Sequence, residues 1–243
     1  MPLKNRGFCM KKKIFGIGIC LFIFILTGLI FFNSDSFKKK KEEYNKKQVT
    51  VKYEKIANNV EETNVILEYQ KQFNNDDILG ELSIPNTNLK VPVAQSSNNE
   101  YYLNHLLDKS YNTLGSIFLD YRNKIADRKI IIYGHNSQNV VTEFQLLEKY
   151  INKDYYDGHS DIYIKTVDDE YHYKIFSVYI AVTDYRHVNL KLAGDKYTNH
   201  LSWLKSQSMY DTSVEVNDED ILVLQTCYFE PMGSYLIVAA KKI

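Results

Sequence analysis

The stretch Asp220-Ile-Leu-Val-Leu-Gln-Thr-Cys227-Tyr-Phe-Glu-Pro-Met-Gly-Ser-Tyr-Leu-Ile-Val-Ala-Ala-Lys241 decides the fold of this chain. Its apolar run Ile221 to Leu224 lies between acidic residues and a turn with Pro231 and Gly233, which predicts a buried strand ending near Cys227. A second apolar run, Leu236 to Ala240, predicts the partner strand of a hairpin. A cysteine in such a strand is most often a small buried packing residue.

The cysteine count gives Cys227 more weight. The chain has three cysteines, and Cys9 and Cys20 both lie within the first 32 residues. The remaining chain therefore has no internal disulfide. An unpaired thiol in an exported domain is a candidate reactive group.

The N-terminal region predicts a membrane anchor. Residues 14–32 carry no charged side chain, and a spanning helix needs about 20 residues. A cleaved signal peptide is the alternative, but Phe31-Phe32-Asn33 is a poor cleavage site, and Met10 is a second possible start. We expect a single-pass protein of the cell membrane, with residues 1–13 in the cytoplasm, 14–32 as the transmembrane anchor, 33–77 as a stalk with helices, and 78–243 as an extracytoplasmic domain.

The formal net charge of zero hides an asymmetry. Residues 1–41 hold nine basic residues and one acidic residue, so the rest of the chain has 21 basic and 29 acidic side chains, a net charge of −8. A nucleic-acid partner is not expected, because phosphate binding needs a basic face. Neither a metal centre nor a cofactor is expected, because the chain lacks paired cysteines and a glycine-rich phosphate loop.

From Ile78 onward the pattern is rich in strands. About eight strand-like runs with few intervening helices favour a closed β-barrel with flanking helices over an alternating β/α sheet. A short helix is expected at 98–107, another at 140–151, and a helical insertion before the cysteine strand with a helix near 195–204. The strand-like runs are 78–84, 89–93, 115–120, 129–133, 161–166, 171–182, 221–227 and 236–240, with 214–216 as a possible further short strand.

One of the six histidines is placed like an active-site residue. His135 follows the apolar strand at 129–133 and a glycine, and precedes a helical pattern. The other five lie in polar or mixed contexts. A cysteine at one strand end and a histidine at another are what covalent acyl transfer requires, since a thiolate attacks a carbonyl and an imidazolium protonates the departing amine.

These residues resemble the sortase family, the membrane-anchored cysteine transpeptidases of Gram-positive bacteria. The resemblance covers the chain from about Ile78 to its end, and the helices around the expected barrel make class B the most similar group. It is carried by Tyr133-Gly-His-Asn136, Leu224-Gln-Thr-Cys227, the block Leu114 to Asn123 and the opening Ile78 to Val93.

The resemblance implies an eight-stranded sortase barrel and assigns roles. Cys227 would be the nucleophile that cleaves a sorting signal after its threonine, and His135 the general acid and then base. Thr226 would line the substrate groove. The implied partners are an NPxTN-like or LPxTG-like signal peptide and an amine from a peptidoglycan cross-bridge or a pilin.

One position departs from the family. Sortases carry an arginine on the strand after the cysteine, and here the matching position holds Tyr235, or Ser234 in a shifted alignment. A tyrosine hydroxyl donates a hydrogen bond without a charge, and losing an oxyanion donor costs about a hundredfold in rate. We name Arg186 as the candidate substitute.

Two other interpretations stay open. The missing arginine is compatible with a sortase-fold protein that binds peptides at the cell surface without turnover. A cysteine hydrolase of another fold is disfavoured, because papain-like enzymes place the cysteine on a helix early in the mature chain.

Overall fold

The structure is a computed structural model that describes residues 34–59 and 64–243. The chain divides into two compact units, 1–44 and 45–243, and helix α2 (Asp35–Asn59) begins in the first and ends in the second. All strands belong to the second unit. The contacts described below lie within that unit.

The expected membrane localisation is corrected here. No helix within 34–59 or 64–243 is both long and apolar enough to cross a membrane. The predicted anchor at 14–32 lies outside the described residues. Helix α2, which follows it, is strongly polar, with lysine, glutamate and asparagine along most of its length.

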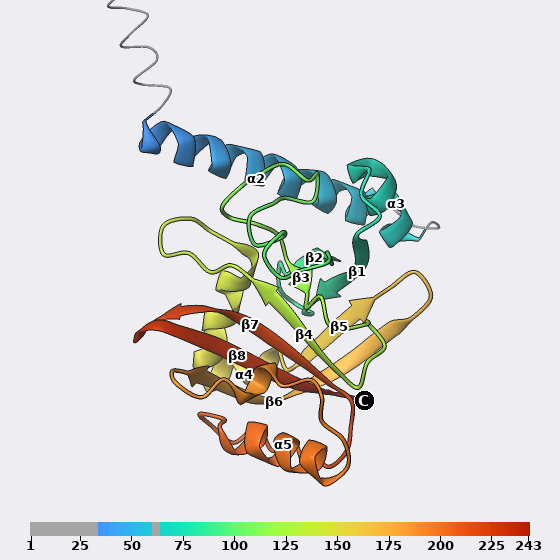
Figure 1. Cartoon of the computed structure of the whole chain (residues 1–243), viewed down its shortest axis with the longest axis vertical. Helices are drawn as coiled ribbons and strands as arrows, with labels where there is room; N and C mark the ends of the chain where they lie inside the picture. The colour runs from blue at the N-terminus through green and yellow to red at the C-terminus, as the bar shows by residue number, and fades with distance from the viewer. Residues whose placement is uncertain (1–33, 60–63) are drawn as a thin grey trace, which may run out of the picture. The chain divides into compact units, whose positions relative to one another are not determined.

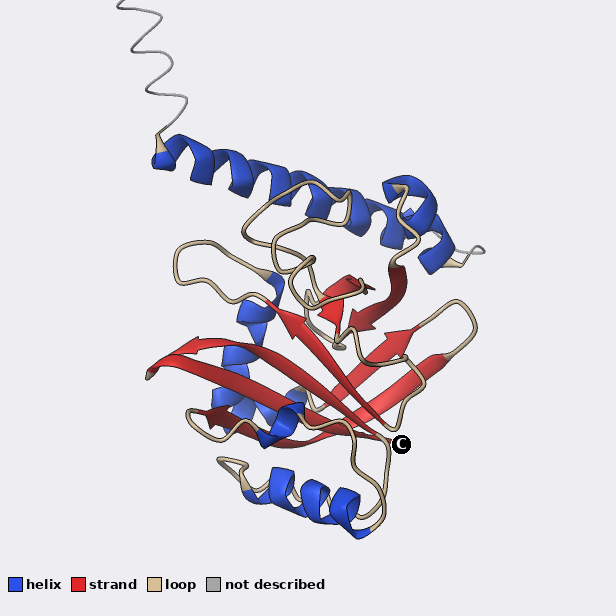
Figure 2. Cartoon of the chain, in the orientation of Figure 1, coloured by secondary structure: helices blue, strands red, loops and turns tan. Residues whose placement is uncertain are grey.

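Eight strands close into a barrel, as the sequence predicts (Figure 2). Their order around the barrel is β1-β2-β3-β4-β7-β8-β6-β5. The elements after α2 are α3 (Val65–Phe73), β1 (Ile78–Ser83), β2 (Lys90–Ala94), β3 (Phe118–Leu119), β4 (Lys129–Gly134), the 3-10 helix η1 (Glu143–Ile151), α4 (Lys153–Gly158), β5 (Asp161–Lys165), β6 (Glu170–Ala181), the 3-10 helix η2 (Arg186–Val188), α5 (Asp195–Ser206), β7 (Ile221–Phe229) and β8 (Met232–Lys242).

Two expected elements are absent from the described residues. Residues 98–107 form turns in place of a helix, because the backbone there pairs with the returning chain: Leu106 N donates to Ser110 O and Ser116 N to Tyr102 O, both at 2.9 Å. Residues 214–216 have no strand partner, although Val216 is buried against the outer face of the barrel.

The two faces of β7 pack against different cores, as the alternation of side chains along a strand requires. Leu222 and Leu224 point into the barrel, whereas Ile221 and Val223 lie in a second cluster with Leu201 and Leu204 of α5. In Figure 1, α5 lies outside the barrel beside β6. By the same alternation Thr226 lies on the inner face and Cys227 on the outer face, the side that the insertion with η2 and α5 covers.

Candidate active site

The parallel pairing of β4 with β7 brings His135 and Cys227 to the same end of the sheet. The register runs from Lys129 opposite Ile221 to Gly134 opposite Thr226. His135 and Cys227 are each the next residue along their chains. Two residues 92 positions apart thus become neighbours because both strands point the same way (Figure 1).

Thr226 and Gly134 hold the strand ends together. The Thr226 hydroxyl donates to Gly134 O at 2.7 Å, and Thr226 is 2% exposed. Gly134 has no room for a side chain, because a Cβ there would overlap the side chains of Ile117 and Phe144. Thr226, expected in the substrate groove, therefore ties β7 to β4 one residue before the thiol.

Burial favours the neutral forms of both candidate reactive groups. Burial lowers the pKa of His135, more than the hydrogen bond with the Leu103 carbonyl raises it. Burial also raises the pKa of the half-buried Cys227 thiol. Both shifts disfavour the thiolate and imidazolium pair in the free protein.

The His135 ring is fixed by a backbone carbonyl. Its Nε2 lies 2.8 Å from Leu103 O. Since a carbonyl only accepts hydrogen bonds, Nε2 carries the proton in the neutral ring, which leaves Nδ1 as the basic nitrogen.

Asn136 connects the histidine loop to the cysteine strand. Its Nδ2 donates to Cys227 O at 3.1 Å and to Glu148 Oε1 at 2.5 Å. The residue is 5% exposed and its Oδ1 is buried without a hydrogen-bond partner. The sequence signal for this residue was its position directly after His135, but the sequence alone assigns it no role.

Tyr235 lies beside the thiol. It is the register partner of Cys227 in the antiparallel pair of β7 and β8. Its ring is half-buried and packs edge to face against Tyr185, with 5.7 Å between ring centroids.

The arginines of the described residues are all paired with carboxylates. Arg186 binds Asp184 through Nε and Nη2 and lies over the Trp203 ring at 4.3 Å. Arg122 forms an ion pair with Asp120, and Arg128 forms ion pairs with Asp218 and Asp220. The structure thus places Tyr235, and none of these arginines, opposite Cys227.

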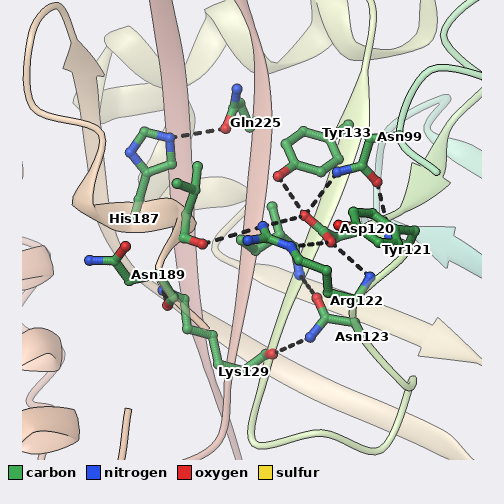
Figure 3. Close-up of polar contacts among 12 residues, drawn as sticks. Asn99, Asp120, Tyr121, Arg122, Asn123, Lys129, Tyr133, His187, Asn189 and Gln225 are labelled. Atoms are coloured by element: carbon green, nitrogen blue, oxygen red, sulfur yellow. Dashed lines mark hydrogen bonds and ion pairs between the residues drawn. The ribbon is translucent and has the colours of Figure 1, made fainter. Parts of the chain in front are cut away.

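A polar network attaches the insertion to the barrel on the outer face (Figure 3). Asp120 is fully buried and accepts hydrogen bonds from Arg122, Tyr133 and Asn99. Burial alone would raise the pKa of Asp120, but these hydrogen bonds outweigh it and lower the pKa. Arg122 Nη2 also donates to Val188 O at 3.3 Å, so the network reaches η2.

Three further contacts hold the insertion. His187 Nε2 lies 2.9 Å from Gln225 Oε1, two residues before Cys227. Lys129 Nζ donates to Asn189 O at 2.7 Å and lies 2.7 Å from His200 Nε2. Burial, followed by the charge of Arg122, lowers the pKa of Lys129 to about 7. These contacts keep the insertion against the face on which Cys227 lies.

A groove of about 500 Å³ lies beside the ends of β4 and β7, and none of its lining residues belongs to the insertion with η2 and α5. It lies between the residues that follow His135, the hairpin that follows Cys227, and η1. Among the described residues, no group of His, Cys, Asp or Glu side chains is placed to hold a metal ion. The groove is lined by Ser137, Gln138, Gln145, Glu148, Lys149, Ile151, Asn152, Tyr228, Phe229 and Glu230.

Comparisons with known proteins agree with this geometry. The model of the Sortase domain matches residues 82–243. Sortase B of Listeria monocytogenes is 35% identical over 157 residues, which are 63% of this chain and 63% of that protein, just under two thirds of its length. Sortase B of Staphylococcus aureus is 31% identical over 172 residues, 68% of this chain and 70% of that protein. The solved Staphylococcus aureus sortase B-substrate complex has a TM-score of 0.72 at 26% identity and covers 85% of this chain and 98% of its own.

Proposed function

Because this chain belongs to the sortase family, we propose that it is a class B-like cysteine transpeptidase that cleaves a sorting signal and transfers the acyl part to an amine. The observation that carries the proposal is the parallel register of β4 and β7, which sets His135 beside Cys227 at one sheet end.

In the first half of the reaction, the Cys227 thiol gives its proton to His135 Nδ1 as Sγ attacks the carbonyl carbon of the signal's threonine. The C–N bond then breaks, the imidazolium protonates the departing amine, and a thioester remains on Cys227. The imidazole is suited to this because burial keeps it neutral and Leu103 O holds its other nitrogen.

In the second half, an acceptor amine attacks the thioester. The C–N bond forms as the C–S bond breaks, and the proton lost by the amine returns through His135 to the thiolate. The groove between the histidine loop and the β7–β8 hairpin supports this step, because its two carboxylates, Glu148 and Glu230, outnumber its one cation, Lys149, and attract an ammonium group. That ammonium loses one proton to water before the neutral amine attacks.

The signal peptide is proposed to lie on the opposite side, under the insertion. A relative solved as a substrate complex supports a peptide partner. The following experiment decides whether the motif is NPxTN-like or LPxTG-like. Its oligoglycine amine stands in for a peptidoglycan cross-bridge, and a lysine-containing pilin peptide in its place tests the other acceptor.

Intact-mass spectrometry of the full chain with a panel of both kinds of signal peptide tests the proposal. A mass gain equal to the acyl fragment, lost in Cys227→Ala and discharged by an oligoglycine amine, is expected. His135→Ala is expected to lose nearly all of this gain. Peptide cleavage that persists in Cys227→Ala would refute the role of the thiol.

A second candidate is a sortase-fold module that binds peptides without turnover. Tyr235 at the position opposite Cys227, together with the engagement of Arg122, Arg128 and Arg186 by carboxylates, favours it. Peptide binding with neither adduct nor cleavage for any member of the panel would select this candidate.

A further inference from the structure

Helix α2 carries a buried lysine on its barrel-facing side. Lys46, Val49, Tyr53 and Ile56 are the buried positions of this helix, at spacings of three, four and three that define one helical face. Lys46 is 7% exposed, and lysine is almost never buried unless it is paired.

The ammonium group of Lys46 has two partners. It lies 2.9 Å from Glu143 Oε1 and donates to Gly115 O at 2.7 Å. The Tyr53 hydroxyl also donates to Glu143 Oε1, at 3.2 Å. Lys46 thereby joins α2 to two separate segments, the loop that contains Gly115 and the start of η1.

Gly115 is packed against the carbonyl that holds the histidine. Its φ is +55°, and a Cβ there would lie 2.6 Å from Leu103 O. That same oxygen accepts the hydrogen bond from His135 Nε2. Lys46 is therefore connected to His135 through one carbonyl group, one backbone packing contact and one hydrogen bond.

Glu143 connects Lys46 to the chain that follows His135. It is the first residue of η1, and the loop from His135 to Thr142 leads directly into it. Through Lys46, the ion pair thus joins the loop that contains Gly115, which packs against Leu103 O, to η1, which follows His135 in the chain. A shift of the pair would move both supports of the ring.

We propose that Lys46 and Glu143 are positioning residues that hold the Leu103 carbonyl against His135 and thereby keep the proton of the neutral ring on Nε2. The inference rests on the proposed function in taking His135 as the proton-transfer group. It assigns to α2 a role in the site, although α2 contributes no group that touches substrate.

The charges near His135 give the inference a second, electrostatic signature. After burial, which lowers the pKa of His135 most, and the Leu103 hydrogen bond, which raises it, Lys46 lowers the pKa and Glu143 raises it. Two other ionisable residues lie at this end of the sheet: Cys227 on β7 and Glu148 on η1, whose carboxylate Asn136 connects to the Cys227 carbonyl. Removing Glu143 should therefore lower the pKa of His135. Removing Lys46 takes away a charge that lowers the pKa, but it also loosens the Leu103 hydrogen bond, the larger effect, which raises the pKa.

The test is ¹⁵N NMR of the His135 imidazole in the full chain, with Lys46→Met, Glu143→Gln and Lys46→Arg. In Lys46→Met we expect the Nδ1–H tautomer to become populated and the pKa of His135 to fall, because the lost Leu103 hydrogen bond outweighs the removed Lys46 charge. Glu143→Gln should lower the pKa as well, because it removes a charge that raises it. A misplaced proton-transfer group costs up to about a hundredfold in rate, so we expect kcat to fall about tenfold with KM within about twofold. In Lys46→Arg, which keeps the positive charge, the tautomer and the pKa of His135 should stay close to those of the wild type.

Lys52→Met is the matched control, since Lys52 lies on the same helix but bonds to Gln72 O, away from the histidine. Lys46→Met leaves the Glu143 carboxylate without its ion partner and could unfold the protein. In that case the double variant Lys46→Met/Glu143→Gln, which removes both charges, is measured in place of the single variant. A His135 tautomer and pKa equal to those of Lys52→Met would overturn the inference. The NMR signals need no turnover, so a protein that forms no thioester would refute the proposed function and leave this test intact.

Discussion

The stability of this protein should fall in mild acid because of a buried histidine in the insertion. His187 is 0% exposed and Nε2 binds Gln225. Burial lowers its pKa from 6.5 to about 4, against a smaller raising effect of the Gln225 hydrogen bond. The unfolded chain takes up the proton near pH 6.5 and the folded chain near pH 4, so stability is lost as the pH falls between these values.

The magnitude follows from the two pKa values. With 1.36 kcal/mol for each pKa unit, the full effect is roughly 3.4 kcal/mol, and roughly 2.5 kcal/mol of it is lost between pH 7 and pH 4.5. His187→Phe removes the titration but also the hydrogen bond to Gln225, which costs about 1 kcal/mol at neutral pH. The variant should therefore be less stable than the wild type at pH 7 and more stable at pH 4.5, and the two stability curves should cross at about pH 5.7.

Urea unfolding measured at several pH values between 4.5 and 7 tests this prediction. Trp203 is the single tryptophan, and it packs 6.1 Å from Tyr179 in the outer cluster, so its fluorescence reports on the insertion. His159→Phe, at a half-buried histidine outside the insertion, is the matched control. The assignment to His187 would be refuted if the unfolding free energies of the wild type and His187→Phe changed with pH in parallel. It would also be refuted if the curve of His159→Phe crossed that of the wild type in the same way.

Two further predictions concern the site and its support. If the Tyr235 hydroxyl serves the oxyanion, Tyr235→Phe should slow thioester formation about tenfold or more, and Tyr235→Arg should raise the rate above the wild type; an unchanged rate in Tyr235→Phe rejects that role. Gly115→Ala should destabilise the fold by about 2 kcal/mol or more in urea unfolding, because its φ is +55° and a Cβ would meet the Tyr102 and Leu103 carbonyls. Gly158→Ala, where a Cβ meets nothing within 4 Å, is the control, and an equal loss in both variants would contradict the argument.

The sequence predicted the parts of the fold that rest on local pattern. The apolar runs at 129–133 and 221–224 became β4 and β7, and the interrupted pattern before Asp220 became the insertion with α5. The parallel pairing of β4 and β7 could not be read from the sequence, because the paired residues are about ninety positions apart. The expected helix at 98–107 was wrong because its amide groups pair with the returning chain at 110–116, a contact that helical spacing does not show.

The support of His135 was harder to predict than His135 itself. Lys46 lies in a stretch whose composition predicts a solvated stalk, since its neighbours in sequence are lysine, asparagine and glutamine. The available signal was its spacing from Val49, Tyr53 and Ile56, which places a lysine on the apolar face of a helix. Leu103 contributes only its backbone carbonyl, so no side-chain pattern could have singled it out.

The arginines of the described residues are unequal as replacements for the one missing opposite Cys227. Arg128 precedes β4, whose six residues span about 20 Å, so it lies at the wrong end of the sheet. Arg122 holds the fully buried Asp120, and leaving a buried carboxylate without its ion partner costs about 3–5 kcal/mol, which is as much as one oxyanion donor returns. The Arg186–Asp184 pair is exposed, so solvent weakens it, and the other contact of Arg186 is with the Trp203 ring. Of the three, we therefore propose Arg186 as the arginine that substrate binding would recruit, whereas Tyr235 already lies in register with Cys227 on β8.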